Sequence, residues 1–292
     1  MNKICVVGAG KMGQAFLRGF QANNLQERFE IHSSCKSNKS KAHLEQTFSW
    51  PVHLENSKAV KKASVVILGV KPFQIESVLK EISPQLNDNT VVISLAAGIT
   101  LEQIHRKIPH VKSVVRVMPN LPATLGKGVI VYATSSEMDS ESESRVEELL
   151  LLLGQTFKVP ERLMDAAAAL SGGAPAYVGY FIEALTLAGV KLGFSQEMAS
   201  EMVIKSFYGS SEMLYTQKDL SAATMMNQVC TPGGTTIEGI GQLEEAGVKG
   251  AVLRAVTAAA EKSAFLGGRK LFSVSLPALP ESKTKSNVRL KK

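Results

Sequence analysis

Residues 3–13 read Lys3-Ile4-Cys5-Val6-Val7-Gly8-Ala9-Gly10-Lys11-Met12-Gly13, and this segment is the strongest indication of the fold class. A short apolar strand pattern runs directly into three glycines spaced as Gly-x-Gly-x-x-Gly, and an apolar helical pattern follows. In this context Gly8 allows a tight turn, Gly10 lets the backbone approach a diphosphate, and Gly13 lets the helix pack on the strand. The free N–H groups at the start of the helix would bind the diphosphate. The alternative is a tight turn without a ligand.

The first half of the chain continues the alternation of strand and helix patterns. Strands are expected at 3–7, 29–33, 65–70, 91–95, 112–117 and 128–133, and helices at 12–22, 72–82 and 101–108. Alternation of this kind predicts an α/β, Rossmann-like domain whose parallel sheet is covered by helices on both faces.

The character of the sequence changes after about residue 160. A helix at 141–153 and a strand at 156–159 are followed by helical patterns at 162–170, 174–192, 196–217, 235–246 and 249–266. We therefore predict a dinucleotide-binding domain over 1–160, an all-α domain over 161–275, and a basic, disordered tail over 276–292.

Composition excludes several other classes of protein. The net charge of the 292 residues is +7, but residues 281–292 contain five Lys or Arg against one Glu, so we expect no nucleic-acid partner. The uncharged stretch 166–182 is interrupted by Gly172, Gly173 and Pro175 and is shorter than the ~20 residues of a membrane span. No signal peptide is visible, the three Cys lie far apart, and no metal-ligand pattern occurs. We expect a cytoplasmic protein without a metal.

The end of the second strand bears on the choice of cofactor. An acidic residue there would bind the ribose hydroxyls of NAD. The chain instead has hydroxyl and basic side chains, namely Ser33, Ser34, Lys36 and Lys39. These donors suit a 2′-phosphate, so we predict NADPH, with NADH as the second choice. The alternative is a polar surface loop.

Three further segments carry candidate ligand-binding groups. Gly69-Val70-Lys71-Pro72 and Ser94-Leu95-Ala96-Ala97-Gly98 end strands on the side where open α/β sheets bind ligands. Whether Lys71 contacts the cofactor or only begins a helix is left open. In the helical half, Cys230-Thr231-Pro232-Gly233-Gly234-Thr235-Thr236 leaves N–H groups and two hydroxyls at a helix start, which would bind a carboxylate. The alternative is helix capping alone.

These motifs, with Met118-Pro119-Asn120-Leu121-Pro122, resemble those of pyrroline-5-carboxylate reductases over residues 1–268. The resemblance implies reduction of the cyclic imine 1-pyrroline-5-carboxylate to L-proline with NAD(P)H, the last step of proline biosynthesis. It implies a homodimer, with a decamer as the larger alternative, and active sites near subunit interfaces. The chain departs from the family at Gly173, where a Ser or Cys is usual, and at Ala174, where Gly is usual.

The resemblance also implies roles for single residues. The implied cofactor-binding residues are Val7, Gly8, Ala9, Gly10, Lys11, Met12, Ser34, Asn56, Gly69, Val70, Lys71, Pro72, Leu95, Ala96 and Ala97. Gly234, Thr235 and Thr236 would bind the substrate carboxylate, and the Thr236 hydroxyl would lie near the ring nitrogen as the catalytic group. The proton on that nitrogen comes either with an iminium substrate or from Thr236 backed by water.

Two rival functions are weighed against this one. A β-hydroxyacid dehydrogenase would carry a catalytic Lys, and usually an Asn, on the long helix, and the segment 174–189 has neither. A non-catalytic NADP-binding sensor on the same fold is opposed by the intact Thr235-Thr236 pair, and turnover of the imine with NADPH would separate the two.

Overall fold

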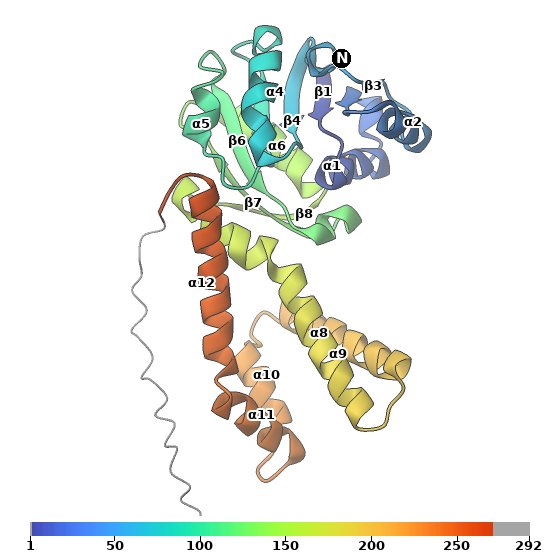
Figure 1. Ribbon diagram of the computed structural model, residues 1–292, viewed down its shortest axis with the longest axis vertical. Coiled ribbons are helices and arrows are strands. Elements are labelled where there is room, and N and C mark those ends of the chain that lie inside the picture. Colours follow the sequence, from blue (N-terminus) through green and yellow to red (C-terminus); the bar gives the residue numbers. More distant parts are fainter. Residues whose placement is uncertain (1, 271–292) are drawn as a thin grey trace, which may run out of the picture.

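A computed structural model describes residues 2–270 of the chain (Figure 1). Its first half is built on one eight-stranded sheet with the strand order β3-β2-β1-β4-β5-β6-β7-β8. The strands are β1 (Asn2–Val7), β2 (Phe29–Ser34), β3 (Val52–His53), β4 (Ala63–Leu68), β5 (Val91–Ser94), β6 (Ser113–Met118), β7 (Gly128–Thr134) and β8 (Gly154–Lys158). The α/β class predicted from the alternating patterns is confirmed.

One strand departs from the predicted parallel sheet. Strand β7 pairs antiparallel with β6, whereas every other neighbouring pair of strands is parallel. A parallel crossover needs about a dozen residues or more. The connection 119–127, which contains the short helix η4 (Leu121–Leu125), is too short for one, so the chain turns back beside β6.

Helices cover both faces of this sheet, and alternate residues of each strand reach opposite cores. Ile4 and Val6 of β1 pack with Phe16 on one face, whereas Cys5 and Val7 pack on the other. The helices of this half are α1 (Lys11–Ala22), η1 (Leu25–Glu27), α2 (Asn38–Thr47), α3 (Asn56–Val60), η2 (Pro72–Gln74), α4 (Ile75–Ile82), η3 (Ser83–Gln85), α5 (Leu101–His105) and α6 (Ser140–Leu151).

The second half is helical throughout its described residues and extends away from the sheet (Figure 1). Its elements are η5 (Glu161–Leu163), α7 (Met164–Ala167), the π-helical turn η6 (Ala168–Gly172), α8 (Ala174–Lys191), α9 (Gln196–Thr216), α10 (Ala222–Val229), α11 (Thr235–Glu245) and α12 (Val248–Leu266). The predicted tail lies outside the described residues, and the predicted domain limits stay predictions.

The entry to α8 explains one departure from the family pattern. A Cβ added at Gly173 would lie 2.7 Å from the carbonyl oxygen of Ala169 and 2.9 Å from the Tyr177 hydroxyl. A Ser or Cys at this position would therefore require the π-helical turn before it to shift.

A buried ion network joins the two halves of the chain. Arg116 of β6 pairs with Asp165 of α7 at 2.9 Å, and Asp165 also pairs with Arg269 at 2.8 Å and accepts a hydrogen bond from Ser263 at 2.9 Å. Arg269 also donates to the carbonyl of Gly98, at 3.2 Å. The end of α12 is thereby fixed against the loop that follows β5.

Candidate active site

The glycine loop is closed by backbone contacts that only glycine allows. Gly8 has φ +83°, and a Cβ there would lie 2.4 Å from the side chain of Val70. A Cβ at Gly13 or Gly69 would lie 2.6 Å from the carbonyl oxygen of Gly8. The end of β1, the start of α1 and the end of β4 therefore approach one another as closely as their backbones permit.

Gly10 stands apart from these packing glycines. No atom lies within 4 Å of the Cβ that it would carry, and it caps α1 without any side-chain hydrogen bond. The first-turn N–H groups of a helix have no partners within the helix. The open space beside Gly10 is therefore what a diphosphate at the start of α1 requires, and the loop fits a dinucleotide.

A cavity of about 640 Å³ lies beside this loop at the carboxyl edge of the parallel strands. Seven of the predicted cofactor residues line it: Gly8, Ala9, Gly10, Asn56, Gly69, Val70 and Lys71. The wall also includes residues that the sequence reasoning did not single out, namely Cys35, Ser40, Leu54, Phe73, Gln74, Ser77, Val78 and Glu81. Most of these lie on or beside α2 and α4, where nothing in a single sequence distinguishes a cavity-facing side chain from a solvated one.

The remaining predicted cofactor residues lie near the cavity but not on its wall. Val7, Lys11 and Pro72 each adjoin a wall residue in the chain, and Met12 follows Lys11 in the first turn of α1. Leu95, Ala96 and Ala97 follow β5, where the Leu95 N–H donates to the carbonyl of Leu68 at 3.0 Å. All of them share the carboxyl edge of the sheet with the glycine loop.

Ser34 is fully buried, although it was predicted to meet the 2′-phosphate. Its hydroxyl donates to Asn56 Oδ1 at 2.7 Å, and its carbonyl accepts from the N–H groups of Gly8 and Ala9 at 3.2 and 3.0 Å. Lys36, two residues further on, does line the cavity. Lys39, the other predicted lysine, lies on α2 and is not among the wall residues.

Two histidines lie side by side on β2 and β3, close in the chain to the cavity-wall residues Cys35 and Leu54. His32 Nδ1 is 2.9 Å from His53 Nε2, and His32 Nε2 is 2.6 Å from a carboxylate oxygen of Glu30. Burial is the largest cause that lowers the pKa of both imidazoles below the ordinary value of 6.5. The neutral form of both rings is therefore favoured in the folded protein.

The predicted carboxylate-binding loop joins α10 to α11. Gly233 has φ +67°, and Gly234 caps α11 without a side-chain hydrogen bond. Thr235 and Thr236 are exposed in the first turn of that helix. Figure 1 shows this loop and α11 in the part of the helical half that lies away from the sheet. A single copy of the chain therefore does not bring Thr236 together with the loop after β5.

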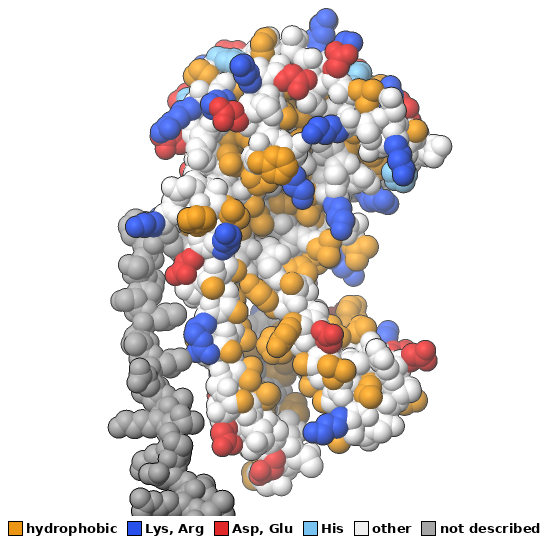
Figure 2. Space-filling model, viewed as in Figure 1, with side chains coloured by type: hydrophobic (Ala, Val, Ile, Leu, Met, Phe, Trp, Pro, Cys, Tyr) orange, Lys and Arg blue, Asp and Glu red, His pale blue; other side chains and the backbone are white. Residues whose placement is uncertain are grey.

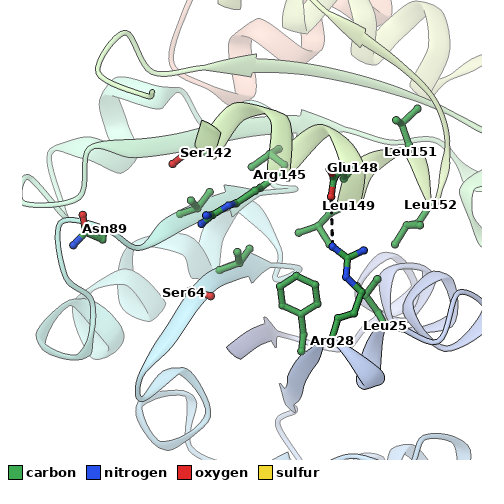
Figure 3. A pocket seen from close by; sticks show the side chains of 14 residues that line it. Leu25, Arg28, Ser64, Asn89, Ser142, Arg145, Glu148, Leu149, Leu151 and Leu152 are labelled. Carbon is green, nitrogen blue, oxygen red and sulfur yellow. Dashed lines mark ion pairs between the residues drawn. The ribbon is translucent and has the colours of Figure 1, made fainter. Parts of the chain in front are cut away.

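A second cavity, of about 550 Å³, lies at the opposite edge of the sheet (Figure 3). It is lined from the first residues of β4 and β5, from η1 and from α6, and Arg28 and Glu148 face each other across it at 4.0 Å. Ligands of open α/β sheets bind at the carboxyl ends of the strands, so this cavity is not a candidate for the active site. Within residues 2–270, no His, Cys, Asp and Glu group could hold a metal ion, and no helix is long and apolar enough to cross a membrane.

The fold and the cavity define the class of protein, a dinucleotide-binding oxidoreductase with a helical second half. A family model described as pyrroline-5-carboxylate reductase dimerisation matches residues 161–266, and one described as NADP oxidoreductase coenzyme F420-dependent matches residues 3–98. The chain belongs to the pyrroline-5-carboxylate reductase family, and it is an NAD(P)-dependent oxidoreductase.

Individual relatives support this assignment over nearly the whole chain. The pyrroline-5-carboxylate reductase of Corynebacterium melassecola is 36% identical over 91% of this chain and 99% of its own length. That of Aquifex aeolicus is 34% identical over 89% and 96%. The crystal structure of the Plasmodium falciparum enzyme with NADP bound has a TM-score of 0.81 at 30% identity, covering 91% of this chain and 98% of that one.

Proposed function

We propose that this protein reduces 1-pyrroline-5-carboxylate to L-proline and uses NADPH in preference to NADH. The observation that carries the proposal is the glycine-lined cavity at the carboxyl edge of the sheet, in a chain that belongs to this reductase family. When bound, the reduced nicotinamide supplies the hydride.

The preference for NADPH rests on the charge at one corner of the cavity. Lys36 lines the wall just beyond β2, and no acidic residue follows that strand. A lysine at this position pairs with the 2′-phosphate that NADPH carries and NADH lacks. Ser34 is buried behind this corner and supports it through the hydrogen bond to Asn56.

The loop before α11 binds the substrate in this proposal. The first-turn N–H groups of α11 hold the carboxylate, and the Thr236 hydroxyl lies against the ring nitrogen. Both interactions orient the imine carbon, and orientation is the main contribution that the protein makes to the rate. The proton on nitrogen arrives with an iminium substrate or through Thr236.

The active site is completed by a second copy of the chain. The only buried residues of helices α8 to α12, within the described part of the chain, are Thr186, Ala199, Ala260 and Ala264. Large apolar side chains such as Tyr180, Leu187 and Leu253 are more than half exposed, and Figure 2 shows hydrophobic side chains gathered over the helical half. A homodimer would cover this surface and bring the α11 loop of one copy toward the cavity of the other.

Two measurements test the proposed function. NADPH oxidation with 1-pyrroline-5-carboxylate, repeated with NADH, is expected to give a higher kcat/KM with NADPH. Absence of turnover with either cofactor would overturn the proposal. Light scattering is expected to show a dimer or a multiple of it, such as a decamer, and an active monomer would contradict the shared site. A cytoplasmic location stays a prediction from the sequence.

A further inference from the structure

Glu81, a residue of α4, makes three hydrogen bonds to the chain beside the cavity. One carboxylate oxygen accepts from the backbone N–H groups of Asn56 and Ser57, at 2.9 and 3.2 Å. The other oxygen accepts from Asn56 Nδ2 at 2.7 Å. Glu81 and Asn56 both line the nucleotide cavity, so these bonds lie at its wall.

The charge of Glu81 determines how the Asn56 amide is turned. An ionised carboxylate can only accept hydrogen bonds, so the NH₂ group of Asn56 must face Glu81 and its oxygen must face Ser34. The hydroxyl of Ser34 then has to donate to that oxygen, over the observed 2.7 Å. Ser34, Asn56 and Glu81 therefore form a chain of hydrogen bonds, called the relay below. In each of its bonds only one of the two groups can be the donor.

We propose that Glu81 is a positioning residue for the adenosine end of the cofactor, which acts by fixing the orientation of the Asn56 amide. The inference rests on the proposed function: Asn56 is one of the cofactor-binding residues that the resemblance implies, and it lines the same cavity as Lys36, which is assigned to the 2′-phosphate on the adenosine of NADPH. With the relay intact, Asn56 presents its second N–H and the second lone pair of its oxygen on fixed sides. A ligand then meets a preset donor and acceptor instead of an amide that must first turn.

The variant Glu81→Gln tests the relay because it keeps the shape and replaces an acceptor by a donor. The Gln NH₂ group would oppose the Asn56 NH₂ group, so the Asn56 amide must turn over or move. NADPH and NADH share the same adenosine, and we expect both dissociation constants, measured by calorimetry, to rise together by about two- to tenfold. The kcat at saturating cofactor should stay within about twofold of that of the unmodified protein.

The matched control is Glu76→Gln, which removes the same charge from the same helix. Glu76 is exposed, pairs with Lys107 and does not line the cavity. The dissociation constants of Glu76→Gln for NADPH and NADH should match those of the unmodified protein. A second arm combines Glu81→Gln with Asn56→Ala. Since Glu81 acts through Asn56, the double variant should bind no more weakly than Asn56→Ala alone.

Several outcomes would overturn the inference. One is unchanged or tighter binding of both cofactors by Glu81→Gln. Another is tighter binding of NADPH alone, which would indicate direct repulsion of the 2′-phosphate. A third is that Glu81→Gln weakens cofactor binding by the same factor in the Asn56→Ala variant as it does in the unmodified protein. If Glu81→Gln does not fold, Asn56→Ala alone must weaken both cofactors in parallel, and unchanged binding overturns the inference. Unmodified protein that binds neither cofactor would instead refute the proposed function.

Discussion

Arg116 and Asp165 form an ion pair in which both side chains are almost completely excluded from water, at 2.9 Å across the junction of the two halves. The same Asp165 oxygen accepts from Ser263 and Arg269, so one carboxylate gathers donors from β6, α12 and the segment beyond it. A charge buried in this way is tolerated only because its partners are also there.

Replacing Asp165 by Asn should therefore destabilise the protein strongly. The change leaves the buried Arg116 guanidinium with only the Glu161 carboxylate as counter-charge, at 3.5 Å and partly exposed. The expected cost is about 3 kcal/mol, the low end of the range for breaking a buried pair. Denaturant unfolding measures the loss. The exposed Asp88 provides the control, and Asp88→Asn should change the free energy of unfolding by less than about 0.5 kcal/mol. Equal effects of the two variants would show that the ion pair does not hold the junction together.

Lys36→Ala should weaken NADPH more than NADH. Removal of the cation takes away a charge-assisted contact with the 2′-phosphate, which NADH lacks. We expect the KM for NADPH to rise about three- to tenfold and that for NADH to change less than about twofold. Lys39→Ala is the matched control, since Lys39 is not among the residues of the cavity wall. Parallel losses for both cofactors in Lys36→Ala would remove Lys36 from the recognition of the phosphate.

Thr236→Val should lower kcat/KM at least about tenfold, because the variant keeps the shape of the side chain without its hydroxyl. NADPH affinity should be nearly unchanged, since Thr236 is assigned to the substrate and is not among the residues of the cavity wall. Thr257→Val is a control on α12, where the hydroxyl donates only to the carbonyl of Leu253. Turnover at the unmodified rate would leave only the backbone N–H groups of the loop as the substrate clamp.

Acid should destabilise the protein through His32 and His53. Their lowered pKa values mean that the unfolded chain binds protons at a higher pH than the folded protein does. The free energy of unfolding should therefore fall as the pH drops below 6.5, the ordinary value. His53→Gln should reduce this dependence in denaturation at pH ~7.5 and ~5.5. His43→Gln, at an exposed histidine, should retain it, and identical slopes for the two variants would refute the assignment.

The sequence predicts most of the fold because its main strands are apolar on both faces. Residues such as Val66 and Ile67 of β4 are buried on opposite sides of the sheet, so the pattern is visible without the structure. Helix α2 is largely polar and has a single buried residue, Leu44, and α10 has only eight residues; neither was predicted. The antiparallel orientation of β7 follows from the short connection 119–127. The apolar pattern of a strand does not indicate the direction in which the strand runs in its sheet.

The candidate site could be predicted only where one continuous segment carries it. The glycine loop is local, and its three glycines occupy the turn that their spacing indicated. The Asn56–Glu81 contact joins residues 25 apart, and the Asp165–Arg269 contact joins residues 104 apart. Such pairs arise from packing and have no signature in a single sequence. The assigned roles of the cofactor and substrate residues stay predictions.

The contact of Arg269 with Asp165 and Gly98 has a consequence for the order in which the chain is made. At about 5–20 residues per second, the 104 positions from Asp165 to Arg269 take roughly 5–20 s to synthesise. During that interval the sheet and Asp165 already exist, while the final partner of the carboxylate does not. A nascent chain can therefore form the Arg116–Asp165 pair early, but the contacts of Arg269 with Asp165 and Gly98 form only when the last described turn has been made. Truncation just after α12 would remove those late contacts and keep the early ones.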